Sequence, residues 1–144
     1  MLFLDPFLKR FLPVFLIWPL YAHAASLLIV ASPLVPENRI TIKELADIYI
    51  MKKEDWSNGI RIVPVNREVT SPEREKFSKE VFNLSPEQMA DYLNRLRFQG
   101  KLPPSVQTSD QAVLNFVRSI PGAIGYVSSM DHPPKDVKIL MQLP

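Results

Sequence analysis

The residues best equipped for chemistry lie between positions 66 and 74, where the sequence reads Asn-Arg-Glu-Val-Thr-Ser-Pro-Glu-Arg. Ser71 followed by Pro72 is a strong helix start, because serine caps the first amides and proline suits the first helical position. The free amides and the dipole of a helix N-terminus attract anions. Arg67 and Arg74 flank this start and add positive charge. The segment therefore has the groups needed to hold an oxyanion.

A purely structural interpretation of the same residues stays open. Thr70 and Ser71 can serve as helix caps alone. Arg67 and Arg74 can be ordinary solvated surface charges, and Asn66 can be a turn residue. The types of residue in this segment do not decide between capping and anion binding.

Groups suited to catalysis are scarce. The chain has no cysteine, so disulfides and thiolate metal sites are excluded, and its two histidines are His23 and His132. His132 lies in a proline-rich loop without a readable partner, and no metal-ligand cluster is visible. With only four glycines, the chain has no phosphate-cradling glycine loop. We expect a protein that is not an enzyme and uses neither a cofactor nor a metal.

The charge balance argues against a polyanion-binding protein. Seventeen lysines and arginines face fifteen acidic residues, which gives a formal net charge of +2. The segment from Arg95 to Lys101 mixes basic and aromatic residues, a combination that also occurs in nucleic-acid binding proteins. At so small a net charge we expect no nucleic-acid partner.

The first 24 residues have the order of a secretory signal peptide. Lys9 and Arg10 precede the apolar run from Phe11 to Tyr21, which ends in Ala22-His23-Ala24. The run is shorter than the roughly 20 residues of a spanning helix, and prolines interrupt it. We expect cleavage after Ala24 and a periplasmic or otherwise exported domain of residues 25–144; an uncleaved membrane anchor is the other interpretation.

Strands and helices alternate along residues 25–144. Leu27–Ala31 is continuously apolar, which predicts a central strand covered on both faces. Helix starts are marked by Thr41 with Glu44, by Ser71-Pro72, by Ser85-Pro86 and by Thr108-Ser109. Further strands are predicted at 60–65, where Pro64 favours an edge or a strand end, and at 123–127 and 137–141.

These elements predict one α/β domain with a partly parallel sheet layered by helices. The last two strands could close as an antiparallel hairpin. A single core should contain Ile29, Ile62, Phe77, Leu93, Phe116 and Ile124. Trp56, before the predicted Asn58-Gly59 turn, is interpreted as a packing residue, with ligand stacking as the alternative.

Several stretches in combination resemble the phosphate-binding components of bacterial phosphate ABC transporters. They are Leu45–Tyr49, Trp56–Gly59, Arg61–Arg67 and Pro121–Val127, in matching order and spacing. The resemblance implies a single lobe like one domain of a type II periplasmic binding protein, with a mixed, mostly parallel sheet flanked by helices. In such proteins two lobes close over an oxyanion held by helix-terminal amides, hydroxyls and arginines. By this resemblance the anion-binding residues are Asn66, Arg67, Thr70, Ser71 and Arg74.

The chain departs from the family pattern at the helix start. Pro72 and Glu73 stand where the family has glycine and threonine, so one amide donor is lost and a negative charge is gained. We expect weak binding of phosphate or a similar oxyanion, in phosphate uptake or sensing. The alternative is an envelope interaction or sensory module that keeps the fold without the ligand. An envelope protein or a second copy in a homodimer could supply the missing lobe.

Overall fold

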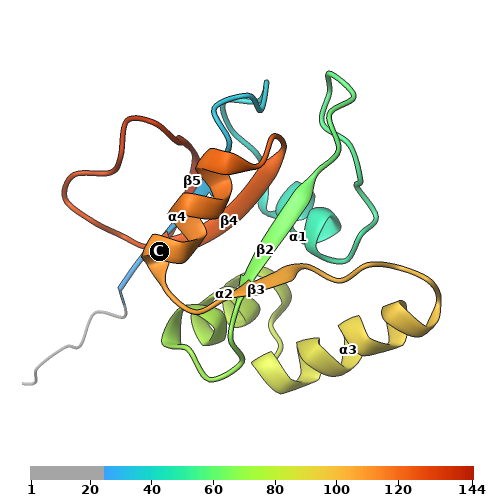
Figure 1. The fold of residues 1–144 in the computed structure, drawn as a ribbon. Helices are drawn as coiled ribbons and strands as arrows, with labels where there is room; N and C mark the ends of the chain where they lie inside the picture. Colours follow the sequence, from blue (N-terminus) through green and yellow to red (C-terminus); the bar gives the residue numbers. More distant parts are fainter. Residues whose placement is uncertain (1–24) are drawn as a thin grey trace, which may run out of the picture.

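The structure, a computed structural model, describes residues 25–144. The expected signal peptide, residues 1–24, lies outside this range, so its cleavage is not tested. Within residues 25–144 no helix is long and apolar enough to cross a bilayer. The elements in chain order are β1 (Leu27–Ala31), α1 (Ile42–Tyr49), β2 (Val63–Arg67), α2 (Pro72–Phe82), α3 (Pro86–Phe98), β3 (Ser105–Gln107), α4 (Asp110–Ser119), β4 (Ala123–Ser128) and β5 (Lys138–Leu143) (Figure 1).

The five strands form one sheet in the order β3-β2-β4-β1-β5. β2 pairs in parallel with both β3 and β4, whereas β1 pairs antiparallel with β4 on one side and β5 on the other. Four strands therefore run in one direction, and β1 alone runs against them. The predicted mixed, mostly parallel sheet is confirmed, and β1 is central as its apolar run indicated.

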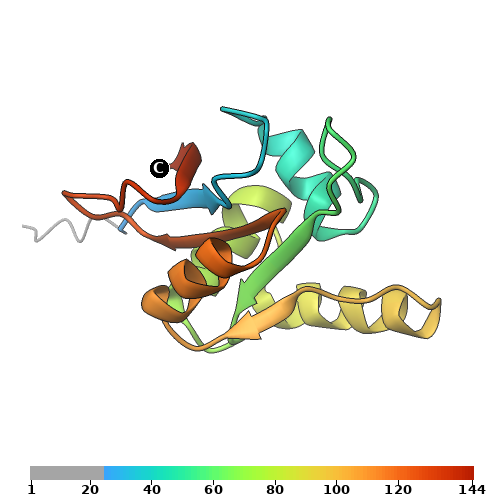
Figure 2. The same ribbon diagram turned by 45° about the horizontal axis from the view of Figure 1, so that its top comes forward.

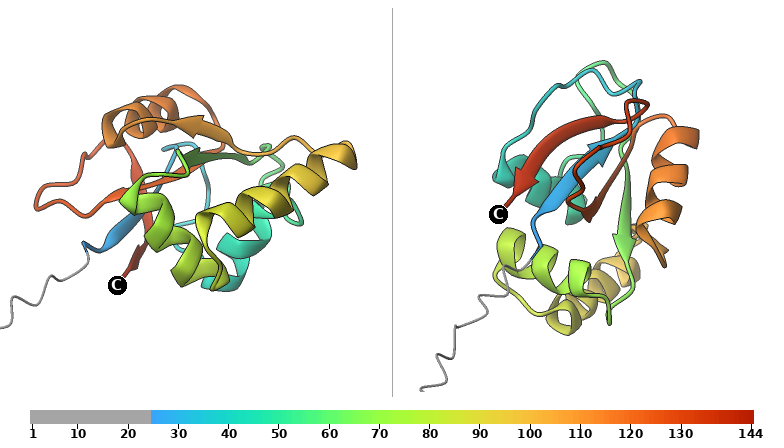
Figure 3. Two further views of the ribbon diagram at one scale, coloured as in Figure 1. Left: turned by 90° about the horizontal axis from the view of Figure 1, so that it is seen from below. Right: turned by 90° about the vertical axis from the view of Figure 1, so that its left-hand side faces the viewer.

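Helices cover both faces of this sheet. Alternate residues of β1 point to opposite faces: Leu27 and Ile29 pack in the cluster with α1 and Phe77 of α2, whereas Leu28 and Val30 pack with α4. The view from the side in Figure 3 shows α4 on one side of the strands and α1 and α2 on the other. The predicted flanking of the sheet by helices is confirmed.

The expectation of a single core is wrong in detail. The sheet separates two apolar clusters, and Leu93 belongs to a third, small one with Met51 and Met89 beneath α3. Phe116 is only partly buried against the α4 cluster, because Val113 and Val117 occupy the face of α4 nearest the sheet. Phe77 instead is the aromatic centre of the other layer, stacked on Tyr126 with ring centroids 4.0 Å apart.

Side-chain caps begin the helices where the sequence predicts. The Thr41 hydroxyl accepts a hydrogen bond from the Glu44 amide, and the Glu44 carboxylate accepts one from the Thr41 amide. Ser71 and Ser85 cap α2 and α3, with proline at the first helical position of each. These local signals are strong because each cap satisfies amides that have no partner inside the helix.

Trp56 is a packing residue that fixes the entry to β4. Its side chain is buried and its indole Nε1 donates to the carbonyl oxygen of Gly122, 2.9 Å away. The amide of Val63 donates to the same carbonyl at 3.0 Å. Gly122 has a φ of +79°, and a Cβ there would lie 2.0 Å from the carbonyl oxygen of Arg61. Only glycine fits this turn between α4 and β4.

Three sequence predictions about the strands need correction. The last two strands do not form a hairpin, because β1 lies between β4 and β5. The second strand begins at Val63 rather than at residue 60, since Asp55 and Arg61 form a bridge around the Asn58-Gly59 turn. Strand β3 carries no signal in the sequence, because it is three residues long and mostly polar.

Candidate anion-binding site

The candidate site lies where the parallel strands end and helices begin. Arg67 is the last residue of β2 and Ser128 the last of β4, and these two strands are neighbours. The chain after β2 leads into α2, and the chain after β3 leads into α4, which begins at Asp110. Ligands of open α/β sheets bind at this edge, outside the carboxyl ends of the strands. The fold thus brings two helix N-termini to the residues predicted to hold an anion.

Arg67 is buried and surrounded by carboxylates. Its side chain is 7% exposed, and its Nη1 lies 2.5 Å from Oδ1 of Asp110. Nη2 lies 3.5 Å from Oε2 of Glu73, and Nε lies 3.6 Å from Oε2 of Glu68. The guanidinium is therefore not a solvated surface charge. It forms ion pairs with three carboxylates of the same chain.

Glu73 and Ser128 complete this side of the site. The Ser128 hydroxyl donates to Oε1 of Glu73 at 3.0 Å, and the Ser128 amide donates to Oδ2 of Asp110 at 3.1 Å. Partial burial acts to raise the pKa of Glu73, but hydrogen bonds from its own amide and from Ser128, together with the charge of Arg67, outweigh it. The pKa of Glu73 therefore lies below its ordinary value, and the carboxylate is charged at neutral pH.

Asn66 is a buried hydrogen-bond acceptor rather than a turn residue. Its Oδ1 accepts from the hydroxyl of Tyr126 and, at 3.2 Å, from the amide of Arg67. The Tyr126 oxygen also accepts from the Arg67 amide at 3.1 Å. Burial raises the pKa of Tyr126 well above its ordinary value, so this side chain keeps its proton and donates. These hydrogen bonds of the Arg67 amide fix the backbone at the end of β2.

Arg74 is the second buried arginine, at 3% exposed. Its Nη1 donates to the carbonyl oxygen of Arg67 at 2.7 Å, and its amide donates to the Ser71 hydroxyl at 3.0 Å. Within residues 25–144 it forms no ion pair, and its Nε has no hydrogen-bond partner. A buried cation without a counter-charge is costly, which sets Arg74 apart from ordinary arginines.

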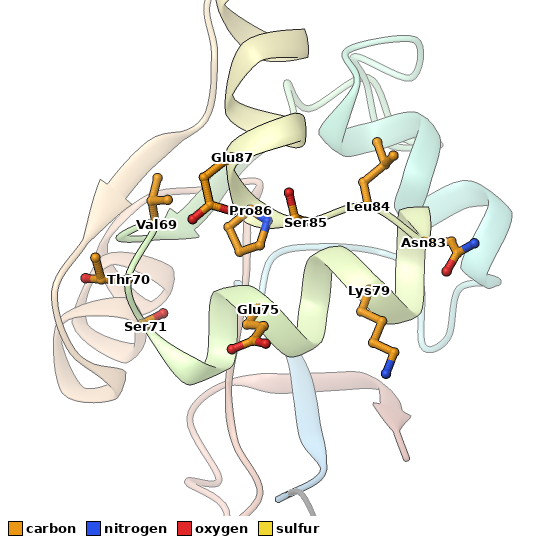
Figure 4. A pocket seen from close by; sticks show the side chains of 10 residues that line it. All are labelled: Val69, Thr70, Ser71, Glu75, Lys79, Asn83, Leu84, Ser85, Pro86 and Glu87. Carbon is orange, nitrogen blue, oxygen red and sulfur yellow. The ribbon is translucent and has the colours of Figure 1, made fainter.

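Thr70 stands apart from the buried residues. It is exposed and lines an open groove of about 570 Å³ between α2 and the start of α3, together with Ser71 (Figure 4). Glu75, Lys79 and Glu87 also border this groove. With two carboxylates and one ammonium along its walls, the groove is less suited to an anion than the arginine site beside it.

The local charge balance is the main electrostatic property of the site. Two buried arginines face three carboxylates, those of Glu68, Glu73 and Asp110. An incoming anion therefore meets a site whose positive charge is already compensated. Without the Glu73 carboxylate, the two arginines would be balanced by the two remaining carboxylates, those of Glu68 and Asp110, so the excess negative charge would be removed.

The structure brings together four of the five predicted residues and leaves one outside. Asn66, Arg67, Ser71 and Arg74 are buried around the end of β2, whereas Thr70 faces the groove. Sequence reasoning missed Asp110, Tyr126 and Ser128. Asp110 follows a capping serine and Tyr126 lies in the Gly-Tyr-Val stretch of β4, but their contact with residues 66–73 depends on the fold. Among residues 25–144 no group of histidine and acidic side chains is arranged to hold a metal ion.

Comparisons with known proteins bear on this arrangement. No family model and no curated protein matches the sequence. Solved structures do match, over more than four fifths of the chain. One is a protein from Clostridium perfringens assigned as a phosphate ABC transporter substrate-binding protein, with bound phosphate: TM-score 0.65, 21% identity and 81% of this chain covered.

The chain has the fold of phosphate transport receptors. An ABC-type phosphate transport receptor from Vibrio cholerae matches at a TM-score of 0.62 with 20% identity over 81% of this chain, and PstS from Borrelia burgdorferi at 0.56 with 17% over 82%. At this identity the likeness concerns the phosphate-receptor fold alone. The chain spans about half the length of these proteins, covering 45%, 46% and 57% of theirs.

Proposed function

We propose that this chain is an exported binding module of the solute-binding type that binds phosphate or a similar oxyanion weakly, in phosphate uptake or sensing. The binding residues are Arg67 and Arg74 with Ser71 and Asn66, and Thr70 lies at the margin. The structural neighbours are solute-binding proteins, and one contains bound phosphate, which supports a role in binding rather than catalysis.

The observation that carries the proposal is that the Arg67 guanidinium pairs with carboxylates of the same chain. This buried guanidinium, at the start of two helices, already binds carboxylate oxygens of Glu73 and Asp110. The site therefore has the geometry to hold oxygen anions. Arg74 adds a buried donor, its Nε, that no group of the described chain uses. A phosphate oxygen that replaced the Glu73 carboxylate would find donors from Arg67 and from the Ser128 hydroxyl.

The same contacts explain why binding should be weak. The anion must displace Glu73, and a single lobe leaves the bound anion open to water, which competes for every donor. We expect a dissociation constant on the order of 0.1 to 1 mM, equivalent to roughly 4 to 5 kcal/mol.

A second candidate function rests on the charge balance. Three carboxylates against two arginines leave no net positive charge for an anion, which favours a module that has lost its ligand and docks to an envelope protein or to a second copy. In that case the Arg67 cluster stabilises the fold and has no ligand.

Calorimetric titration with phosphate and sulfate separates the two candidates. Glu73→Thr should strengthen phosphate binding by removing the competing carboxylate, and Arg67→Ala should weaken it. Arg118→Ala is the matched control, because Arg118 also pairs with an aspartate, Asp136, but on the exposed side of α4. It should bind as the wild type does. Circular dichroism checks that each variant is folded. If neither the wild type nor Glu73→Thr shows saturable binding up to about 10 mM, the binding proposal fails and the docking candidate replaces it.

A further inference from the structure

The end of α3 and the loop after it expose two large apolar side chains. Phe98 is 91% exposed and Leu102 is 88% exposed. In Figures 1 and 2 this end of α3 and the following loop project beyond the sheet. Water contact of a phenylalanine and a leucine at one projecting site is unfavourable, and such exposure marks an interaction surface. We call residues 95–102 the α3 tip.

Basic side chains surround the two apolar ones. Arg95, Arg97 and Lys101 are all exposed, so the tip alternates cationic and apolar groups. Lys101 Nζ lies 3.1 Å from Oε1 of Glu54, whereas Arg95 and Arg97 form no ion pair within residues 25–144. Of the two acidic residues of α3, Glu87 lies about three turns before Phe98, and Asp91 lies one turn before Arg95, so three cations of the tip face two nearby carboxylates, Asp91 and Glu54. The tip therefore carries a local excess of positive charge.

The backbone holds the tip in a fixed shape. Gly100 ends α3 with a φ of +84°, and the amide of Lys101 donates to the carbonyl oxygen of Leu96 at 3.1 Å. This pair of features is the Schellman arrangement of a helix end. Phe98 and Leu102 thus lie on either side of one tight turn in the chain.

The small apolar area and the positive charge of the α3 tip indicate which kind of partner it can bind. A stable protein interface buries about 1,200 to 2,000 Å² in total, far more than one phenylalanine and one leucine can supply. Contact between the tips of two copies would bring cations against cations. A bilayer requires neither a large area nor a matching groove, since a few apolar side chains enter it while basic neighbours remain at the head groups.

We propose that the α3 tip docks this protein to the surface of an anionic phospholipid bilayer. Phe98 and Leu102 enter the boundary between head groups and acyl chains, and Arg95, Arg97 and Lys101 contact lipid phosphates. The tip lies at the end of α3, whereas the groove beside the anion site lies at its start, about 18 Å away for a helix of this length. The two surfaces are therefore separate, and the proposal does not depend on the proposed function.

A fluorescent label tests the proposal, because the chain has no native cysteine. An environment-sensitive dye on Leu102→Cys of the full chain should shift to shorter wavelength when vesicles of phosphatidylglycerol and phosphatidylethanolamine are added. The same dye on Leu34→Cys is the matched control, since Leu34 is also exposed, at 59%, but belongs to the loop between β1 and α1, which Figure 1 shows well away from the end of α3. It should not respond. This local readout is independent of any membrane contact made by residues 1–24.

The charge requirement is tested with the same label. Exchanging Arg95→Gln together with Arg97→Gln should raise the lipid concentration for half-maximal response roughly 10- to 30-fold, and vesicles of phosphatidylcholine should give little response. Both substitutions are at exposed positions, so folding should persist. No response at Leu102, an equal response at Leu34, or a Leu102 shift that follows protein concentration without lipid would each overturn the proposal, the last in favour of self-association.

Discussion

At the scale of single residues, Glu73 determines what Arg67 can do. Its carboxylate lies within 3.5 Å of the guanidinium and accepts a hydrogen bond from Ser128, so it occupies a position that a bound anion would need. If the proposed function is correct, this one carboxylate lowers the affinity for an anion and at the same time stabilises the folded chain. Stability and affinity should respond in opposite directions when Glu73 is replaced.

We predict that the contribution of Glu73 to stability disappears in acid. Because the folded protein lowers the pKa of Glu73, its stabilising effect is fully present above the ordinary value of 4.5 and is lost as the pH falls through the lower folded pKa. Glu73→Gln should lower the free energy of unfolding by roughly 1 kcal/mol at pH 7, and the difference from the wild type should shrink as the pH falls below 4.5.

Urea unfolding between pH 7 and pH 3 measures this difference. Glu75→Gln is the control on the same helix, because Glu75 is exposed and forms no ion pair within the described chain. It should follow the wild type at every pH. A constant difference between Glu73→Gln and the wild type across the range would show that the charge of Glu73 plays no part.

The sequence predicts candidate site residues that lie close together in the chain, and it does not indicate the neighbours that the fold brings to them. Ser71-Pro72 and the two arginines are local signals, and the penalty expected from Glu73 agrees with its contact to Arg67. Asp110 lies 43 positions after Arg67, and no local pattern links the two. The burial of Arg74 was equally hidden, because exposure is the rule for arginine and only packing overrides it.

At the scale of elements, the two faces of the sheet are unequal. The face covered by α1 and α2 contains the aromatic group of Tyr49, Phe77 and Tyr126, whereas the face covered by α4 is mainly aliphatic. The aromatic group lies directly beneath the anion site, because Tyr126 also donates to Asn66. Damage to this layer should therefore affect the site as well as the fold.

We predict different costs for two phenylalanine truncations. Phe77→Ala should lower the free energy of unfolding by about 3 to 5 kcal/mol, since Phe77 is 1% exposed and contacts two tyrosine rings. Phe116→Ala should cost roughly 1 to 2 kcal/mol, because its side chain is only partly removed from water. Chemical denaturation of both variants decides this; equal losses would contradict the unequal burial.

The helices could be predicted and part of the sheet could not, for a physical reason. A cap or a proline acts within a few residues, so each helix start can be predicted from the residues next to it. Strand order depends on pairing between distant segments. Nothing near Lys138–Leu143 indicates that β5 pairs with β1 rather than with β4. Ser105–Gln107 forms a strand only because it pairs with the free edge of β2.

At the scale of the whole molecule, β1 joins the two ends of the chain. Leu27 pairs with Leu143 across the sheet, and Leu140 and Leu143 are buried in the same cluster as Ile29. We predict that deletion of Lys138–Pro144 abolishes cooperative unfolding, because β1 loses one partner and the cluster loses two leucines. Deletion of exposed Pro144 alone should leave the transition unchanged. Thermal unfolding followed by circular dichroism makes the comparison, and a cooperative transition in the longer deletion would contradict the prediction.

The central position of β1 also sets the order of events during synthesis. The strand is the first described element to be made, yet both of its partners, β4 and β5, are the last. Closing contacts between segments so far apart in the sequence is entropically costly and slow, and the sheet cannot be completed before Leu143 has been synthesised. In a nascent chain of this topology, β1 therefore has no strand partner until residues 123–143 have been made.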